Sequence, residues 1–388
     1  MLLPLAVAFA FVTMQPALAE IDDCGSREFR QAFLAGSPMD PSGEIVIDYS
    51  SPDPRLVKAG DRVLPCLAAI VVEGTGEGLP ECRKEPRLCW SWAMGAVTQI
   101  GTPRAAGFLL SVAGSTDDPD RLIGAAGSLA SMHVREAIPI LLARLDSGEG
   151  RVRARLVMSL GILKARDCTP ELVRTTLGLK PEDFYYAIHG FGFLGDPSVV
   201  PALRKYVDAM PATDMRKSLT AQVNDIAVVA NFQAGMEQKN GGVLPWAESF
   251  LRAAIAEGEK TGSASPTLAE ADYELGDMCR RGGRWDEAET LLAQAADLMP
   301  KFLSLNGGKR LDVDIAGALT RDARGANPEL ARKFSYFARV LHAARPERKK
   351  EIWDRFPELR DAFTRYESYC RANKLQACQQ DLSEYITR

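Results

Sequence analysis

The ten residues Leu194-Gly195-Asp196-Pro197-Ser198-Val199-Val200-Pro201-Ala202-Leu203 contain the end of one predicted helix, a polar turn and the start of the next helix. A small residue closes the first helix, Asp-Pro makes the turn, and apolar residues follow it. The same order recurs three times upstream, and the closing residues fall into register at steps of 30, 30 and 34. These residues are Gly101, Ser131, Gly161 and Gly195. A fixed period of this length is typical of a chain of helical hairpins.

Four features of this region follow a known pattern: Val152-Arg153 at a helix start, Leu160-Gly161 and Leu194-Gly195 at helix ends, Asp196-Pro197 in a turn, and Val200-Pro201-Ala202-Leu203 in the next helix. On these features residues 90–212 resemble HEAT repeats, more closely the short repeats of the phycobilisome lyase family. The chain departs from that family at Met132-His133, where Leu-Gly is expected. The resemblance implies stacked helix pairs, because one pair cannot bury its apolar face alone.

A second period, of 41 residues, follows. Identical residues recur at this separation: Ala230 and Ala271, Gly235 and Gly276, Gly242 and Gly283, Ala247 and Ala288, Glu248 and Glu289, Leu251 and Leu292, and Ala254 and Ala295. In the second copy Leu275-Gly276, Trp285 and Pro300 stand in the order of a tetratricopeptide repeat, which residues 213–305 therefore resemble. Asp272 and Cys279 replace the Trp and Tyr of that pattern. The extra length falls in residues 258–266, as in the longer repeats of kinesin light chains.

Two segments flank the repeats. Residues 20–89 are rich in turn residues, with a short strand expected at 44–49 and a degenerate first repeat at 53–72. Residues 306–388 start at an expected helix break, Asn306-Gly307-Gly308, and continue as a cap of three helices whose first is capped by Asn327. Eight aromatic side chains are expected either to form the core of this cap or to cover the last tetratricopeptide-like helix: Phe334, Tyr336, Phe337, Trp353, Phe356, Phe363, Tyr366 and Tyr369.

The fold class follows from these patterns and from the length of 388 residues, which is ample for two to three domains with a sizeable core. We expect an all-α chain folded as a right-handed αα superhelix, a solenoid of HEAT-like and then tetratricopeptide-like hairpins. Along the chain we expect a leader (1–19), an irregular N-terminal region (20–89), the two sets of repeats (90–212 and 213–305) and the helical cap (306–388).

The N-terminus and the cysteines indicate the compartment. Residues 1–19 carry no charge and end in Ala17-Leu18-Ala19, which is typical of a cleaved signal peptide, with an uncleaved anchor as the alternative. All eight cysteines follow this leader, and an even number behind a secretion signal predicts disulfides. We expect the local pairs Cys82–Cys89 and Cys370–Cys378, with Cys168 and Cys279 as buried thiols. The predicted location is periplasmic or secreted, with no membrane span once the leader is removed.

The charge balance excludes some partners for the whole molecule. Lysine and arginine number 47 and aspartate and glutamate 51, so the formal net charge is −4. Nucleic acid and anionic membranes require a basic surface that displaces counterions. We therefore expect neither nucleic acid nor an anionic membrane as the partner.

The motifs that carry chemistry are weak in this chain. Gly190-Phe191-Gly192-Phe193-Leu194-Gly195 matches the dinucleotide fingerprint, but it closes a predicted helix where the fingerprint follows a strand and opens one. Its glycines are better explained by the close packing of helices. The three histidines, His133, His189 and His342, share no metal-ligand spacing, and no Gly-x-Ser-x-Gly nucleophile motif is present. We therefore predict no catalytic residue, metal or cofactor.

The preferred hypothesis is an exported, non-enzymatic scaffold or adaptor that binds protein partners, within a bacterial envelope assembly. Stacked hairpins present a long surface at fixed spacing, and both resemblances imply adaptors. The candidate partner-binding residues are Trp92, Arg153, Tyr185 and Tyr186, because Trp, Tyr and Arg dominate binding hot spots. Arg153 belongs to a basic run, Arg151-x-Arg153-x-Arg155, whose alternate positions do not share one helix face.

Two alternatives stay open. A cofactor-handling or lyase-like enzyme would use the groove of the HEAT-like repeats, as the phycobilisome lyase resemblance implies, with His189 or Cys168 as the residues whose change abolishes turnover. A permanent structural part of an envelope machine differs from the scaffold only in the lifetime of the assembly, and a large exposed apolar patch would favour it.

Overall fold

The computed structural model describes residues 24–36, 52–74, 79–146, 148–262, 265–298, 303–323, 325–376, 378 and 382. Within these residues the chain forms nineteen α-helices, four short 3-10 helices and no β-strand, which confirms the all-α prediction. The leader at 1–19 and the strand expected at 44–49 lie outside the described residues. The chain divides into two compact units, residues 1–168 with 174–190 and residues 169–173 with 191–388. Each unit is described by itself below.

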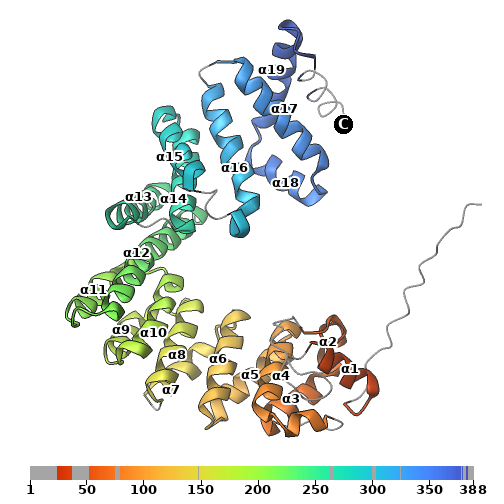
Figure 1. Cartoon of the computed structure of the whole chain (residues 1–388), viewed down its shortest axis with the longest axis vertical. Coiled ribbons are helices and arrows are strands. Elements are labelled where there is room, and N and C mark those ends of the chain that lie inside the picture. Colours follow the sequence, from red (N-terminus) through yellow and green to blue (C-terminus); the bar gives the residue numbers. More distant parts are fainter. Residues whose placement is uncertain are drawn as a thin grey trace, which may run out of the picture. The chain divides into compact units, whose positions relative to one another are not determined.

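The helices of the first unit follow one another in hairpins (Figure 1). They are α1 (Arg27–Gly36), α2 (Pro54–Ala59), α3 (Leu64–Glu73), α4 (Pro86–Ile100), α5 (Pro103–Ser115), α6 (Pro119–Ser131), α7 (Ala137–Leu145) and α8 (Gly150–Ile162), with 3-10 helices η1 (Gly60–Arg62), η2 (Pro80–Arg83) and η3 (Arg166–Cys168). Two helices, α9 (Thr169–Leu177) and α10 (Pro181–Leu194), contribute to both units. Alternate helices also pack together, α4 on α6, α6 on α8 and α5 on α7.

The small residues in register lie where the first helix of each hairpin ends. Gly101 and Gly195 follow α4 and α10 in the left-handed conformation, which glycine adopts without strain, with φ of 66° at both. Ser131 is the last residue of α6, and Gly161 lies one residue before the end of α8. Proline then occupies the first position of α5 and α6, behind the side-chain caps Thr102 and Asp118. Helix boundaries in this unit are therefore set by local chemistry.

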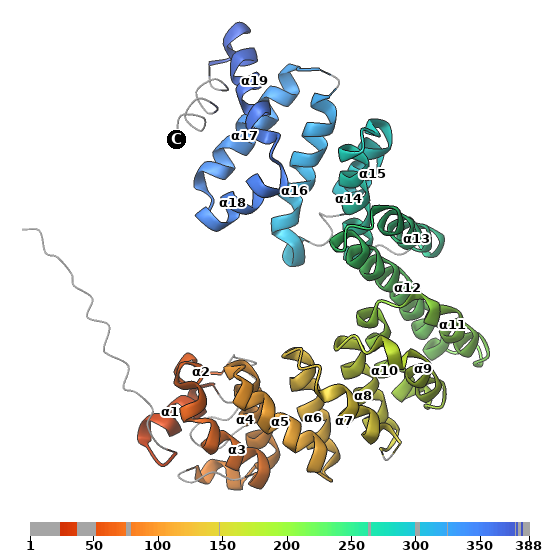
Figure 2. The same cartoon turned by 180° about the vertical axis from the view of Figure 1, so that it is seen from behind.

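The second unit continues the succession of helices (Figure 2). Its helices are α11 (Val200–Asp208), α12 (Asp214–Asn240), α13 (Leu244–Thr261), α14 (Pro266–Arg281), α15 (Trp285–Leu298), α16 (Leu303–Asp322), α17 (Pro328–Ala343), α18 (Pro346–Arg355) and α19 (Leu359–Ala372), with the 3-10 helix η4 (Pro197–Val199). The 41-residue period marks two equivalent helix contacts. A Cβ on Gly235 would lie 3.0 Å from Cγ of Leu251, and one on Gly276 would lie 2.9 Å from Cγ of Leu292. The two hairpins α12–α13 and α14–α15 therefore close around glycine in the same way.

The C-terminal helices correct two expectations. The break expected at Asn306-Gly307-Gly308 is wrong, because α16 runs without interruption from Leu303 to Asp322. Two glycines cost a helix about 2 kcal/mol, and burial of the later apolar residues of α16, such as Ile315, offsets this. Tyr336, expected in the core, is 50% exposed. As predicted, Asn327 caps α17, its Oδ1 accepting a hydrogen bond from the Leu330 amide at 2.9 Å.

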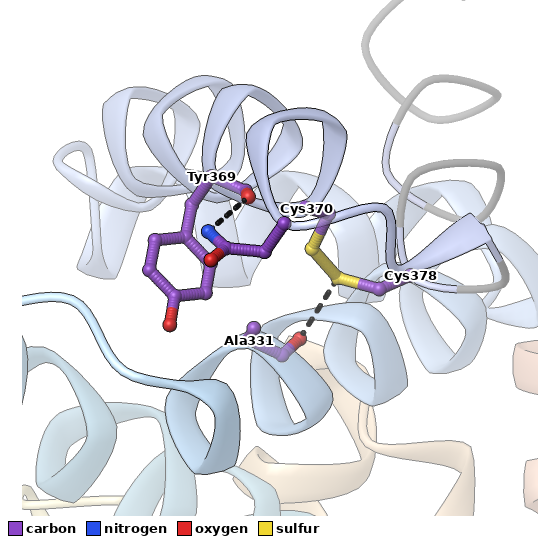
Figure 3. The surroundings of a disulfide bond; sticks show 5 residues. Ala331, Tyr369, Cys370 and Cys378 are labelled. Atoms are coloured by element: carbon purple, nitrogen blue, oxygen red, sulfur yellow. Dashed lines mark hydrogen bonds between the residues drawn. A yellow bond between two sulfur atoms is a disulfide. The ribbon is translucent and has the colours of Figure 1, made fainter.

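Three disulfides join cysteines of the described residues. Two are the expected local pairs, Cys82–Cys89 and Cys370–Cys378, and the third, Cys24–Cys66, spans 42 residues. Figure 3 shows Cys370 and Cys378 above α17, where Sγ of Cys378 lies 3.5 Å from the carbonyl oxygen of Ala331. Three cysteine pairs at disulfide distance fit a periplasmic or extracellular location. Among the described residues, no helix is both long and apolar enough to cross a membrane.

Candidate functional site

The first helices of consecutive hairpins share one exposed side in the first unit. We call this side the first-helix face and define it by residues of α4 (Arg87, Ser91, Gly95 and Thr98), α6 (Asp120, Gly127, Ser128 and Ser131), α8 (Arg151 and Arg155) and α10 (Tyr186 and His189). Apart from the adjacent Gly127 and Ser128, the members from one helix lie three, four or seven residues apart, or combinations of these, which places them on one side of that helix. This face contains a groove and an aromatic cluster.

The groove lies between α4 and α6 and has a volume of about 650 Å³. Its walls include the apolar side chains of Trp90, Met94 and Ile123. Small residues from the two helices also line it, among them Ser91, Gly95, Gly127, Ser128 and Ser131. Pockets of 300–1,000 Å³ are typical of sites that bury small ligands, so this groove has room for a few residues of a peptide.

Three charged residues line the groove, and they come from the first turns of consecutive first helices. The Asp120 carboxylate of α6 accepts a hydrogen bond from Arg87 of α4 and forms an ion pair with Arg151 of α8 at 3.3 Å. Arg87 and Arg151 are 64% and 62% exposed, and Asp120 is half-buried. Two guanidinium groups therefore share one carboxylate, and this end of the groove has a net positive charge.

The aromatic cluster joins α8 to α10. The guanidinium carbon of Arg155 lies 4.4 Å from the ring centroid of Tyr186, within cation–π range. The Tyr185 ring lies edge-on to Tyr186 at 5.3 Å and to His189 at 5.4 Å. Burial, and then the positive charge of Arg155, lower the pKa of His189 below its usual value of 6.5, so the imidazole is neutral at pH 7. The cluster thus presents aromatic rings beside one fixed cation.

The structure separates the four residues that were expected to bind a partner. Tyr185 and Tyr186 belong to the aromatic cluster, and Tyr186 is 40% exposed. Trp92 and Arg153 are partly buried, and among the described residues neither the indole N–H of Trp92 nor Nε of Arg153 finds an acceptor. Arg153 lies two positions from Arg155, about 200° around the helix. The arginine that meets the tyrosines is therefore Arg155.

Sequence reasoning missed the groove charges. Arg87, Asp120 and Arg151 occupy equivalent first-turn positions at steps of 33 and 31, close to the repeat length. The repeat therefore carried a signal for them, namely a column of charges of alternating sign. An alignment of repeats detects positions where the same residue recurs. These charges are hard to detect in that way because their sign changes from one repeat to the next.

The glycine-rich motif contributes to helix packing, and the two cysteines outside the disulfides are Cys168 and Cys279. Gly190 lies inside α10 against α8, where a Cβ would come within 2.8 Å of Cα of Met158, so this glycine of the motif serves helix packing as expected, whereas Gly195 ends α10. Burial raises the pKa of the Cys279 thiol to about 11, which keeps it protonated. Cys168, which was expected to be buried, is only half-buried at the end of η3 and lies outside the disulfides. Among the described residues, no group of three His, Cys, Asp or Glu side chains is arranged to hold a metal ion.

The comparison with known proteins was made at three levels. No protein-family model, no curated protein and no solved structure matches this chain.

Proposed function

We propose that this chain is an exported, non-enzymatic scaffold that binds a protein partner on the first-helix face. The observation that carries the proposal is the position of a groove and an exposed aromatic–cation cluster on one face of consecutive helices. We further propose that the hairpins form a right-handed αα solenoid, HEAT-like and then tetratricopeptide-like. In such a fold each repeat adds one helix to a continuous surface, and extended surfaces of this kind hold other proteins.

The chemistry of the face supports a partner that is a protein. Tyr and Arg are enriched in binding hot spots because they combine a large contact area with polar groups. Arg155 and Tyr186 already hold each other in place at 4.4 Å, so binding loses less side-chain entropy than it would with two independent side chains. The three disulfides and the apolar leader support export, since disulfides persist in oxidising compartments.

Site-specific photo-cross-linking in the native host tests the proposal. p-Benzoylphenylalanine replaces Tyr186 in one strain and Arg104 of α5, an exposed residue on a second helix, in the control strain. We expect a discrete protein adduct from position 186 and none from position 104. Equal labelling at both positions, or no adduct at position 186, would overturn the proposal.

A further inference from the structure

We propose that the groove between α4 and α6 binds an acidic segment of the partner protein, with a partner carboxylate bound by Arg87 and Arg151 beside Asp120 and the partner backbone packed over Gly95 and Gly127. This inference rests on the proposed scaffold function and names the segment that the scaffold recognises.

The positive charge of Arg87 and Arg151 at one end of the groove is complementary to an acidic segment. Among the described residues, Asp120 is the carboxylate that Arg87 and Arg151 share, and both arginines are more than 60% exposed. Each guanidinium has five N–H donors in a planar fork that matches a carboxylate. One shared carboxylate cannot accept from all of these donors, so the pair retains hydrogen-bonding capacity at the mouth of the groove. A second carboxylate would also balance the local charge, with two guanidiniums facing two carboxylates.

Two glycines that line the groove, Gly95 and Gly127, are not required by helix packing. Gly95 lies within α4 and Gly127 within α6, and glycine at an interior helix position is less favourable than alanine. A Cβ on either residue would meet no heavy atom within 4 Å, and neither has a positive φ. In contrast, a Cβ on the neighbouring Gly124 would lie 2.7 Å from Sδ of Met94. Packing thus explains Gly124, whereas Gly95 and Gly127 keep the groove floor open.

The two arginines, Arg87 and Arg151, and the two glycines, Gly95 and Gly127, line the same groove of about 650 Å³. A short segment fits this volume with its backbone on the glycine floor and one acidic group at the arginine end. A phosphate dianion is disfavoured relative to a carboxylate, because Asp120 stays between the guanidiniums and repels the second negative charge.

A random heptapeptide library displayed on phage supplies the probe. The full-length protein is the target, and the selected peptides are synthesised and titrated by fluorescence polarisation against the protein and its variants. We expect the selected peptides to be rich in Asp and Glu, and their binding to weaken with salt. Gly127→Leu, which fills the floor, should weaken binding at least tenfold, as should Arg151→Glu.

Control variants on α5 distinguish an effect on the groove from a general effect of the same substitution on folding. Gly107 lies within α5, and its Cβ also would meet no heavy atom within 4 Å, but it does not line the groove. Gly107→Leu and Arg104→Glu should therefore bind the peptides like the unmodified protein. Circular dichroism and the thermal midpoint of Gly127→Leu test whether this variant is folded, and we expect both to match those of Gly107→Leu.

Three results would overturn the inference: no enriched peptide, enriched peptides without Asp or Glu, or equal binding to Gly127→Leu and the unmodified protein. These failures are distinguishable from a failure of the scaffold function. A protein adduct at position 186 combined with any of them leaves the scaffold standing and removes only the acidic segment from the groove.

Discussion

Gly161 of α8 and Gly190 of α10 meet backbone to backbone, so closely that a Cβ on Gly161 would lie 2.1 Å from the carbonyl oxygen of Gly190. Any larger residue at position 161 must push two helix backbones apart, because the obstructing atoms are not those of a flexible side chain. This contact holds the two first helices that carry the aromatic cluster.

The first prediction concerns this helix contact. Gly161→Ala should lower the free energy of unfolding by about 2–3 kcal/mol, because a buried methyl group is forced against backbone atoms. Gly107→Ala, at an interior helix position with open space around its Cβ, should raise it by about 0.5–1 kcal/mol. Urea denaturation followed by circular dichroism measures both values. Equal effects of the two substitutions would contradict the close contact.

The second prediction ranks two disulfides. The Cys24–Cys66 bridge spans 42 residues and the Cys82–Cys89 bridge spans 7. A longer closed loop restricts the unfolded chain more, so the longer bridge should contribute roughly 4 kcal/mol and the shorter roughly 2.5 kcal/mol. The measurement compares denaturant unfolding of the two double Cys→Ser variants, after peptide mapping of the non-reduced protein has established the pairing. A larger loss from the shorter bridge would reverse the ranking.

The third prediction is a pH dependence that originates at Asp272. Its side chain is buried in α14, and burial together with the nearby charge of Glu259 raises the pKa of Asp272 from 3.8 to about 7. Between these two values the folded protein keeps a proton that the unfolded chain has released, so stability falls as the pH rises from about 4 to 7. Asp272→Asn removes this loss.

Thermal and urea unfolding of the unmodified protein and of Asp272→Asn, each from pH 3.5 to 8, measure the effect. The variant should gain on the order of 4 kcal/mol over the unmodified protein between the lower and the upper end of this range. Parallel curves for the two proteins would show that folding does not raise the pKa of Asp272 and would contradict the prediction.

The fourth prediction compares two arginines that share the Asp277 carboxylate in the second unit. Arg280 is 6% exposed and lies 2.7 Å from Asp277, whereas Arg281 is 56% exposed and lies 2.9 Å from it. Arg280→Met should cost about 3–5 kcal/mol, because it removes the buried partner of a buried carboxylate. Arg281→Met should cost less than about 1 kcal/mol. Chemical denaturation of the two variants measures both losses of stability. Similar losses would contradict the difference in burial between Arg280 and Arg281.

Much of the helical pattern was predictable from the sequence, because helix ends depend on neighbouring residues. Gly101, Gly195 and Asn327 lie at helix boundaries as predicted, since the left-handed backbone and the N-cap restrict the residue type locally. The break at Gly307-Gly308 was wrong because local propensity lost to the burial of α16. The Cys24–Cys66 bridge carried no local signal, since its cysteines are 42 residues apart.

The candidate site was predictable only in part. Tyr185 and Tyr186 were found because residue type alone points to a binding role, and they form one cluster. The sequence does not distinguish Arg153 from Arg155 as the binding arginine, because the phase of a helix relative to its neighbours depends on tertiary packing. The groove between α4 and α6 depends on the spacing of two helices, and no pattern within one repeat contains that information.

Cross-linking in the native host, followed by purification of the tagged full-length protein from the envelope fraction, tests the central claim most directly. The recovered material is compared for the unmodified protein, the Arg155→Ala, Tyr186→Ala double variant, and the Arg104→Ala control. We predict one protein partner at near-equal stoichiometry with the unmodified protein and the control, and at least tenfold less of it with the double variant. A partner recovered equally with all three proteins, or a monomer without a partner, would contradict the account.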